Sequence, residues 1–250
     1  MPKPLFSIIT VTYNAVETLP ATLESVAQQT YSDNFEYLIV DGASSDGTLE
    51  LLERTDIPGM KVVSDPDRGI YDAMNKGLDL AVGEYVIFLN AGDAFHSPDT
   101  LQRIADLIQE NDMPGIVYGQ TDIVDAQRCR LGPRHLSAPE KLTYKSFANG
   151  MLVCHQAMAV LKRITSPYDD LKYRFSADYD WAIRCLQHSR KNVYFNAVMI
   201  DYLAGGTTAR NHYKSLIERF CIMSHYYGII PTILRHFKFA LRGLIHTHRL

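Results

Sequence analysis

The chain has 250 residues, of which 46% are hydrophobic and 21% charged, so it can bury a large core and is not a disordered or collagen-like chain. Lys and Arg number 25 against 28 Asp and Glu, a formal net charge of −3 that gives no reason to expect nucleic acid as a partner. The charge is uneven, because residues 219–250 carry five positive and no negative side chains. A basic tail on an acidic body indicates that the two parts meet different partners.

The four cysteines, Cys129, Cys154, Cys185 and Cys221, are far apart and form no Cys-x-x-Cys pair. This spacing argues against zinc and predicts buried free thiols in a reducing compartment. The apolar run Leu5–Thr12 near the N-terminus is too short for a signal peptide or a membrane span. We therefore expect a cytoplasmic protein.

Apolar runs alternate with segments of helical spacing in the first half of the chain. The runs that predict strands are 5–12, 36–41, 60–64 and 84–90, and the segments that predict helices are 15–30, 48–54 and 70–81. Strands that alternate with short helices predict a parallel sheet with right-handed crossovers. Because these strands are apolar without alternation, we expect both faces of the sheet to be covered.

The alternation loosens after Asp93. The pattern predicts helices at 98–110, 138–147, 156–164 and 178–189, an antiparallel strand pair within 116–131 and a late strand at 193–202. The last forty or so residues predict helices broken near Gly228–Pro231. With no internal repeat or linker, one α/β core with a C-terminal elaboration is expected.

Polar residues follow three of the expected strands. Thr12 and Asn14 follow the first strand, Asp41 ends the second, and Asn90 and Asp93 follow the fourth. The carboxyl ends of parallel strands share one edge of a sheet, where α/β proteins bind their ligands. One such carboxylate commonly only caps a helix or forms a turn, but three polar strand ends together favour a binding crevice.

The usual phosphate-binding loops are missing. Residues 42–48 have Walker-like glycine spacing, but Thr and Leu stand where Lys and Ser or Thr belong, and no Gly-x-Gly-x-x-Gly follows the first strand. A P-loop NTPase and a Rossmann dehydrogenase are therefore disfavoured. A bound phosphate would need a metal to neutralise it, and the Asp93 carboxylate suits Mg²⁺ or Mn²⁺.

Four motifs occur in order: SIITVTYN at 7–14, YLIVDGASSDGT at 37–48, DRGIYDAMNKG at 67–77 and FLNAGD at 88–93. They resemble the family 2 glycosyltransferases, and the resemblance resumes at NGMLVCHQ (149–156) and SADYDW (176–181). It implies the GT-A fold of nucleotide-diphospho-sugar transferases, a Rossmann-like mixed sheet, with a C-terminal helical elaboration. The implied activity is transfer of a sugar from a nucleotide-sugar, typically a UDP-sugar, to an acceptor hydroxyl with inversion, in cell-surface polysaccharide biosynthesis.

The resemblance also implies roles for single residues. Thr12 and Asn14 would line the nucleotide pocket, Asp41 would bond the base, and Asp72 and Asn75 would contact the nucleotide or the sugar.

Asp93 would be the last aspartate of a DxD-type motif that holds Mg²⁺ or Mn²⁺ on the diphosphate. The chain departs from that motif, because Ala91 and Gly92 replace possible acidic partners and leave Asn90 beside Asp93. Metal binding would then lean on the phosphates of the ligand.

Asp178 matches the position of the family's catalytic base. It lies near the start of an expected helix, where a carboxylate can also act as a simple cap. Asp180 is the rival carboxylate, and on a helix it points away from Asp178. His155 and Gln156 are expected to face the donor sugar or the acceptor, although a lone His is more often structural. The late Gly-rich loop at 205–208 resembles a family feature and would otherwise be a turn.

The implied domains are a glycosyltransferase domain at 1–230, with a nucleotide-binding half (1–95) and an acceptor-binding half (96–230), and a basic amphipathic helix at 231–250. That helix suits an anionic membrane surface and a lipid-linked acceptor, with the protein peripheral on the cytoplasmic face; the alternative is a helix packed on the core. Two other functions stay open: a nucleotidyltransferase, and a non-catalytic module that binds sugar-nucleotides or glycans.

Overall fold

The computed structural model describes residues 3–31, 35–205 and 212–247. Its strands are β1 (Phe6–Thr12), β2 (Phe35–Asp41), β3 (Met60–Ser64), β4 (Tyr85–Phe88), β5 (Ala94–Phe95), β6 (Ile116–Val124), β7 (Arg130–Pro133), β8 (Met158–Leu161) and β9 (Asn192–Leu203). The α-helices are α1 (Leu19–Ala27), α2 (Thr48–Glu53), α3 (Ile70–Leu80), α4 (Thr100–Glu110), α5 (Ala177–His188), α7 (His212–Tyr227) and α8 (Ile229–Thr247). Three 3₁₀ turns are η1 (Tyr144–Asn149), η2 (His155–Ala157) and η3 (Lys162–Ile164).

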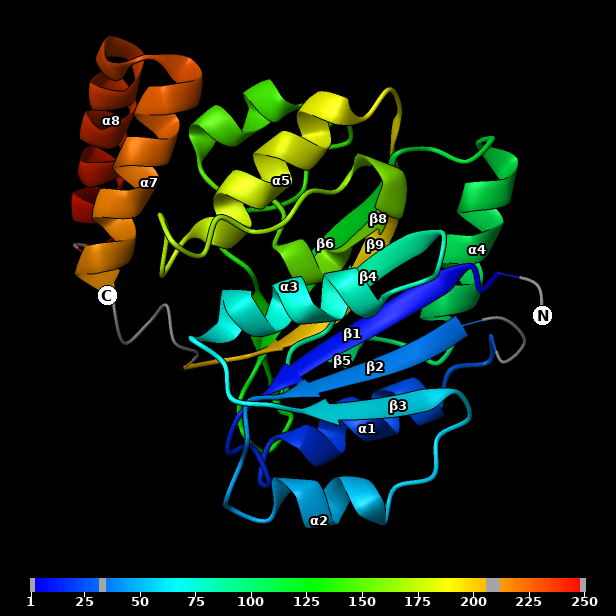
Figure 1. The fold of residues 1–250 in the computed structure, drawn as a ribbon. Helices are drawn as coiled ribbons and strands as arrows, with labels where there is room; N and C mark the ends of the chain where they lie inside the picture. The colour runs from blue at the N-terminus through cyan, green and yellow to red at the C-terminus, as the bar shows by residue number, and fades with distance from the viewer. Residues whose placement is uncertain (1–2, 32–34, 206–211, 248–250) are drawn as a thin grey trace.

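The strands of the described residues form one mixed sheet in the order β3-β2-β1-β4-β8-β6-β9-β5, with β7 paired to β6. Strands β3, β2, β1 and β4 are parallel to one another, as the alternation of these strands with helices in the sequence predicts. The sheet becomes mixed at β8, which is antiparallel to both β4 and β6. Helices α1 and α2 lie on one side of β1–β3 and α3 lies on the other, so both faces of this half are covered (Figure 1). The mixed α/β architecture with C-terminal helices agrees with the expected fold class.

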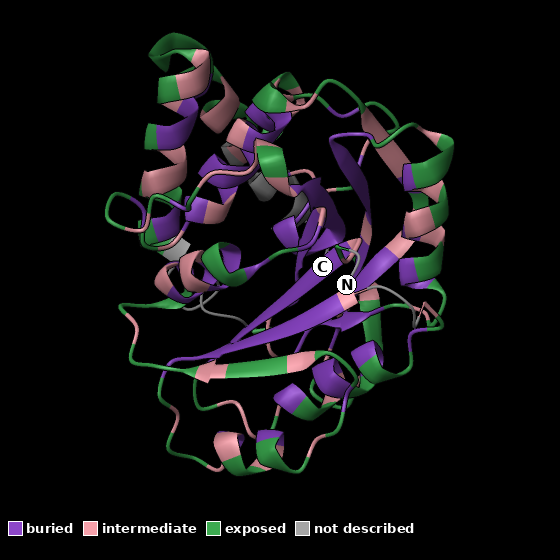
Figure 2. Cartoon of the chain, turned by 45° about the vertical axis from the view of Figure 1, so that its right-hand side comes forward, coloured by how far each residue is buried: buried purple, intermediate pink, exposed green. Residues whose placement is uncertain are grey.

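Burial follows the position of each strand in the sheet. Every residue of β1 and β4 is buried, whereas the edge strand β3 is largely exposed (Figure 2). Helix α3 packs very close to β1, because a Cβ at Gly77 would lie 2.5 Å from Cγ2 of Ile9. The glycine therefore allows the approach that brings the start of α3 to the carboxyl edge of the sheet.

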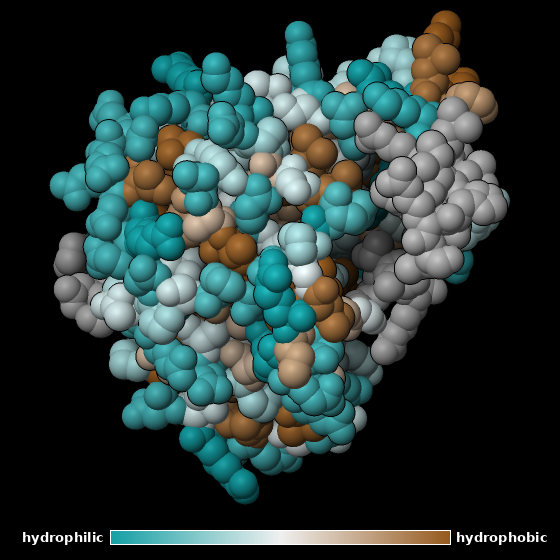
Figure 3. Space-filling model, turned by 180° about the vertical axis from the view of Figure 1, so that it is seen from behind, coloured by the Kyte–Doolittle hydropathy of each residue, from teal (hydrophilic) through white to brown (hydrophobic). Residues whose placement is uncertain are grey.

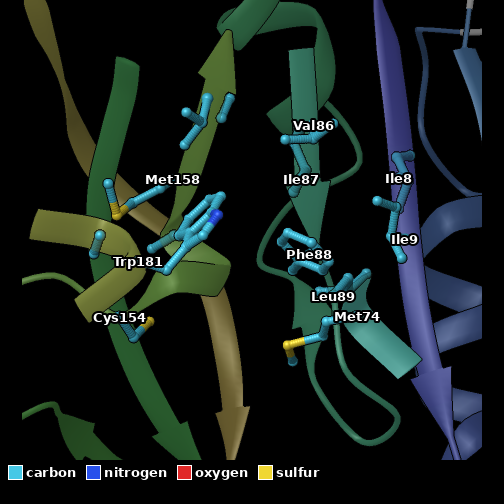
Figure 4. Close-up of a cluster of buried hydrophobic side chains, with 14 of the residues drawn as sticks. Ile8, Ile9, Met74, Val86, Ile87, Phe88, Leu89, Cys154, Met158 and Trp181 are labelled. Atoms are coloured by element: carbon cyan, nitrogen blue, oxygen red, sulfur yellow. The ribbon is translucent and has the colours of Figure 1, made fainter. Parts of the chain in front are cut away.

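An aromatic cluster joins the two halves of the core. The fully buried Trp181 of α5 meets Phe88 of β4 edge to face, with ring centroids 5.7 Å apart, and Met158 of β8 lies beside it (Figure 4). Tyr168 stacks on Trp181 at 5.1 Å. Aromatic pairs of this kind stabilise a fold beyond the burial of their apolar surface, so the cluster fixes α5 against the sheet.

Two expected helices are wrong. Segment 156–164 contains η2, the buried strand β8 and η3, because a short apolar run fits a buried strand as well as a helix. Segment 138–147 forms only η1 at its end, since the carbonyls of Ala138, Pro139 and Glu140 accept hydrogen bonds from side chains of β6. The other expected helices and strands are present with small shifts at their ends.

Cys154 and Cys185 are buried free thiols as expected, whereas Cys129 and Cys221 are exposed, so the expectation of burial is wrong for these two. The C-terminal helices α7 and α8 are separated at Gly228, within the segment where a helix break is expected. Most of the late Gly-rich loop lies outside the described residues.

Candidate active site

The loop after β2 is held by Asn14, the second residue after β1. Asn14 adopts a left-handed conformation with φ 48°; its Oδ1 accepts the N–H of Ser45 at 2.9 Å, and its own N–H donates to Oγ of Ser44 at 2.8 Å. Thr12 is buried, and its hydroxyl has no hydrogen-bond partner in the described part of the chain. The structure thus brings Thr12, Asn14 and the end of β2 together at the carboxyl edge.

Asp41 is fully buried at the end of β2. Its carboxylate accepts bonds from Oγ of Ser44 at 2.5 Å, from the Ser44 N–H at 2.9 Å and from Oγ of Ser64 at 2.7 Å. Asp41 therefore acts as the anchor of this loop.

Asp72 and Asn75 both lie on α3 but have different partners. Asp72 accepts bonds from the Arg68 side chain at 2.6 and 3.2 Å and from the Arg68 N–H at 3.1 Å. The Asn75 amide bonds the backbone of Tyr168 in both directions, at 3.0 and 2.7 Å. Asn75 thus fastens the loop that carries Tyr168, while Asp72 is partly exposed beside the Arg68 guanidinium.

Asp93 is only 4% exposed, in contrast to the open loop position that a strand end suggests. Its Oδ2 accepts from Nε2 of Gln156 at 2.9 Å, and its Oδ1 accepts from the N–H of Leu203 at 3.0 Å. Burial raises the pKa of Asp93 to about 7, although these bonds and nearby His155 and Arg128 act against the rise.

Gly92 explains part of the altered motif. Its φ is +98°, and a Cβ there would lie 2.7 Å from Cδ2 of Leu203. A side chain at 92 would therefore be strained and would clash with β9. A second carboxylate at this position does not fit the packing that holds Asp93.

Asp178 is the second residue of α5, and its side chain is 17% exposed. The Tyr71 hydroxyl donates to its Oδ1 at 2.9 Å, and Nδ1 of His155 lies 3.5 Å from its Oδ2. Burial raises the pKa of Asp178, but His155, Arg219 and Tyr71 outweigh burial and hold it below the usual aspartate range. Asp178 is therefore ionised at neutral pH.

Asp180 faces elsewhere, as the helical spacing predicts. It accepts from Nε of Arg184 at 2.8 Å and from the Tyr226 hydroxyl at 2.8 Å, and so ties α5 to α7. These contacts give Asp180 a structural role.

One short turn links the carboxylates of Asp93 and Asp178. The neighbours His155 and Gln156 of η2 contact Asp178 and Asp93 respectively. The structure thus assembles Asp93, Gln156, His155 and Asp178 into one continuous arrangement from β4 to α5. These contacts could not be inferred from the sequence, because they depend on the packing of β8 between β4 and β6.

The residues at Asp93 fit a divalent cation in part. No group of three or more His, Cys, Asp or Glu side chains in residues 3–31, 35–205 and 212–247 could hold a metal ion. Asp93 offers carboxylate oxygens, however, and Oδ1 of Asn90 is buried without a hydrogen-bond partner among the described residues. These are the oxygen donors that Mg²⁺ and Mn²⁺ prefer, and a diphosphate would have to complete the ligand set.

Comparison with known proteins identifies the class. The family model described as glycosyl transferase family 2 matches residues 7–165. A PGL/p-HBAD biosynthesis glycosyltransferase of Mycobacterium bovis is 36% identical over 209 residues, which cover 81% of this chain and 78% of that protein. The chain therefore belongs to glycosyltransferase family 2 and is a glycosyltransferase.

Solved structures share the fold. Staphylococcus aureus TarS 1–349, in complex with UDP-GlcNAc, has a TM-score of 0.71 and 18% identity over 94% of this chain and 73% of that chain. A mannosyltransferase from Pyrobaculum calidifontis, in complex with GDP-Man and Mn²⁺, has a TM-score of 0.59 and 19% identity over 100% and 80%. Both likenesses support the GT-A fold.

Proposed function

We propose that this glycosyltransferase moves a hexosyl or N-acetylhexosaminyl group from a UDP-sugar to an acceptor hydroxyl with inversion, and that Asp178 is the base. The observation that carries the proposal is an ionised, partly exposed carboxylate at the start of α5, held by Tyr71 and His155. A single displacement needs one such base to take the proton of the acceptor. The UDP-GlcNAc named for TarS supports a UDP-sugar donor, and the M. bovis relative, named for PGL/p-HBAD biosynthesis, supports a biosynthetic role.

The residues of the first half would bind the donor. Thr12, Asn14 and Asp41 would line the nucleotide pocket, and Asp72 and Asn75 would border it from α3.

Asn90 and Asp93 would hold Mg²⁺ or Mn²⁺ together with the diphosphate. A cation bound there would neutralise charge that develops on the departing nucleoside diphosphate. His155 and Gln156 would orient the donor sugar or the acceptor between the two carboxylates. This assignment gives residues 1–95 the nucleotide and residues 96–230 the acceptor, with 231–250 as an appended helix.

A panel of nucleotide-sugars tests the donor. We expect the purified protein to release UDP from UDP-glucose, UDP-galactose or UDP-N-acetylglucosamine faster than it releases GDP or dTDP from the matching donors. Luminescent detection of each nucleotide, with simple alkyl glycosides or water as acceptor, provides the measurement. Release of GDP or dTDP alone would contradict the UDP assignment, and binding of all donors without turnover would support a non-catalytic module.

We also propose that the α7–α8 hairpin rests on an anionic membrane, where a lipid-linked acceptor would be found. Five apolar side chains of α8, Ile229, Ile230, Ile233, Leu234 and Phe237, are each more than half exposed. Apolar side chains gather at the outer end of this hairpin (Figure 3). The basic residues Arg235 and Lys238 belong to the same stretch of α8. Exposed apolar and basic side chains on one helix are typical of interfacial binding. Among the described helices, none has the length and apolar character required to cross a bilayer.

We expect the double variant Leu234→Glu/Phe237→Glu to bind phosphatidylglycerol-containing vesicles about tenfold more weakly than the unchanged protein, since it loses buried apolar surface and adds negative charge. Vesicle co-sedimentation measures binding, and added salt should weaken it. Leu131→Glu is the matched control, because Leu131 is equally exposed on β7. An unchanged protein that ignores these vesicles at low salt would contradict the membrane proposal.

A further inference from the structure

The two oxygens of Asp178 have different surroundings. Oδ1 accepts the Tyr71 hydroxyl at 2.9 Å. Oδ2 faces Nδ1 of His155 at 3.5 Å, longer than a good hydrogen bond, and neither ring nitrogen of His155 has a hydrogen-bond partner in the described part of the chain. Oδ1 is thus fixed by a neutral donor at 2.9 Å, while Oδ2 has only the longer contact with His155 at 3.5 Å.

The Tyr71 hydroxyl is itself held in place. Its ring is buried and stacks on Tyr168, with centroids 5.5 Å apart and planes 20° apart, and Tyr168 stacks in turn on Trp181. Burial and the charge of Asp178 raise the pKa of Tyr71 well above its usual value, so the phenol stays protonated and donates. Tyr71 also lines a surface cavity of about 280 Å³ together with Arg68, Asp170 and Lys172.

We propose that Tyr71 is a positioning residue for the transfer: its hydroxyl holds Oδ1 of Asp178, so that Oδ2 is the atom that receives the acceptor proton. The inference rests on the proposed role of Asp178 as base. The acceptor O–H proton passes to Oδ2 while the acceptor oxygen forms a bond to the anomeric carbon. The bond from that carbon to the diphosphate oxygen breaks, and its electron pair leaves with the nucleoside diphosphate.

The test compares Tyr71→Phe with Tyr168→Phe. Tyr71→Phe keeps the stacked ring and removes only the bond to Oδ1. Tyr168→Phe removes a buried hydroxyl that has no hydrogen-bond partner among the described residues, from the neighbouring ring of the same stack. The matched control therefore changes the same stack of aromatic rings but removes no hydrogen bond to Asp178.

Tyr71→Phe should lower kcat for UDP release by about 10- to 100-fold, the usual effect of a hydrogen bond to a charged group, with KM for the UDP-sugar within twofold. Removal of a bond to the ionised form should also raise the pKa of Asp178, measured by ¹³C-carboxyl NMR and assigned with Asp178→Asn. The other titratable groups that interact electrostatically with Asp178 are His155 of η2, Arg219 of α7, Tyr202 of β9 and Tyr168, and the Tyr71 substitution changes none of them. Tyr168→Phe should leave both kcat and the Asp178 pKa unchanged.

A merely structural role would lower the melting temperature in Tyr71→Phe and leave kcat and the Asp178 titration as in the unchanged protein, and that result would overturn the proposal. If Asp178→Asn itself keeps full activity, the proposed base is wrong, whereas loss in Asp178→Asn with no effect in Tyr71→Phe refutes the positioning role alone. Should Tyr71→Phe fail to fold, 3,5-difluorotyrosine at position 71 retains the ring and strengthens the donor. It should then lower the Asp178 pKa, and no change would again refute the proposal.

Discussion

Asp178→Asn is expected to lower kcat by about 10²–10⁴-fold, because the amide keeps the size of the carboxylate but cannot take the acceptor proton. The hydrogen bond from Tyr71 can still form in this variant, because the carbonyl oxygen of Asn accepts the Tyr71 hydroxyl. KM for the donor should stay near that of the unchanged protein, because the proposed nucleotide contacts lie on β1, β2 and α3. Steady-state kinetics with the donor found in the panel give both constants.

The pH profile gives an independent check on this assignment. Because His155, Arg219 and Tyr71 hold the pKa of Asp178 below the usual aspartate range, the carboxylate stays ionised as pH falls from 7 to 5. A loss of kcat assigned to Asp178 should therefore begin only below that interval.

Asp180→Asn is the matched control two positions along α5. It weakens the ion pair with Arg184 and should lower the melting temperature by a few degrees, while kcat per folded molecule changes little. A larger loss of kcat in Asp180→Asn than in Asp178→Asn would mean that the roles of the two carboxylates are reversed.

Asp93→Asn is expected to reduce transfer by about 10²–10³-fold, the usual effect of losing one preorganised charge on a transition state. Asn is preferred to Ala here because position 93 is buried, and the side-chain carbonyl of Asn can still accept the N–H of Leu203. EDTA should abolish activity in the unchanged protein, and Mn²⁺ or Mg²⁺ should restore it. Calorimetric titration of Mn²⁺ with UDP present should show weaker binding to the variant.

Two outcomes would contradict this view of Asp93. Full activity in EDTA would show that the transfer needs no metal. That result would agree with Gly92 in place of an acidic metal ligand. Equal Mn²⁺ affinity in the variant and the unchanged protein would place the cation elsewhere.

The parallel half of the sheet was predictable because β1, β2 and β4 are continuous apolar runs between helix and turn signals. Strand β8 was not, since four apolar residues between two 3₁₀ turns have no periodicity that separates strand from helix. Nor does any local signal encode the parallel pairing of β6 with β9, whose partners lie about 80 residues apart in sequence.

Site prediction followed the same division. Residues at strand ends could be listed because sheet topology places them, and Asp178 could be listed because it begins a clear helix. Tyr71 was missed, although it lies next to Asp72 in the same motif, because only the tertiary fold brings its hydroxyl to Asp178 of α5. The contacts of His155 and Gln156 likewise depend on where β8 lies.

The placement of His155 and Gln156 on consecutive residues also matters for redesign. In the proposed roles, one peptide unit would serve both reactants, because His155 contacts Asp178 and Gln156 contacts Asp93. A change that tilts η2 to suit a new acceptor would then also disturb the environment of Asp93. Libraries aimed at acceptor choice should therefore leave 155–157 unchanged and vary Leu171, Lys172 and Arg174, which are exposed and line the surface cavity beside Tyr71.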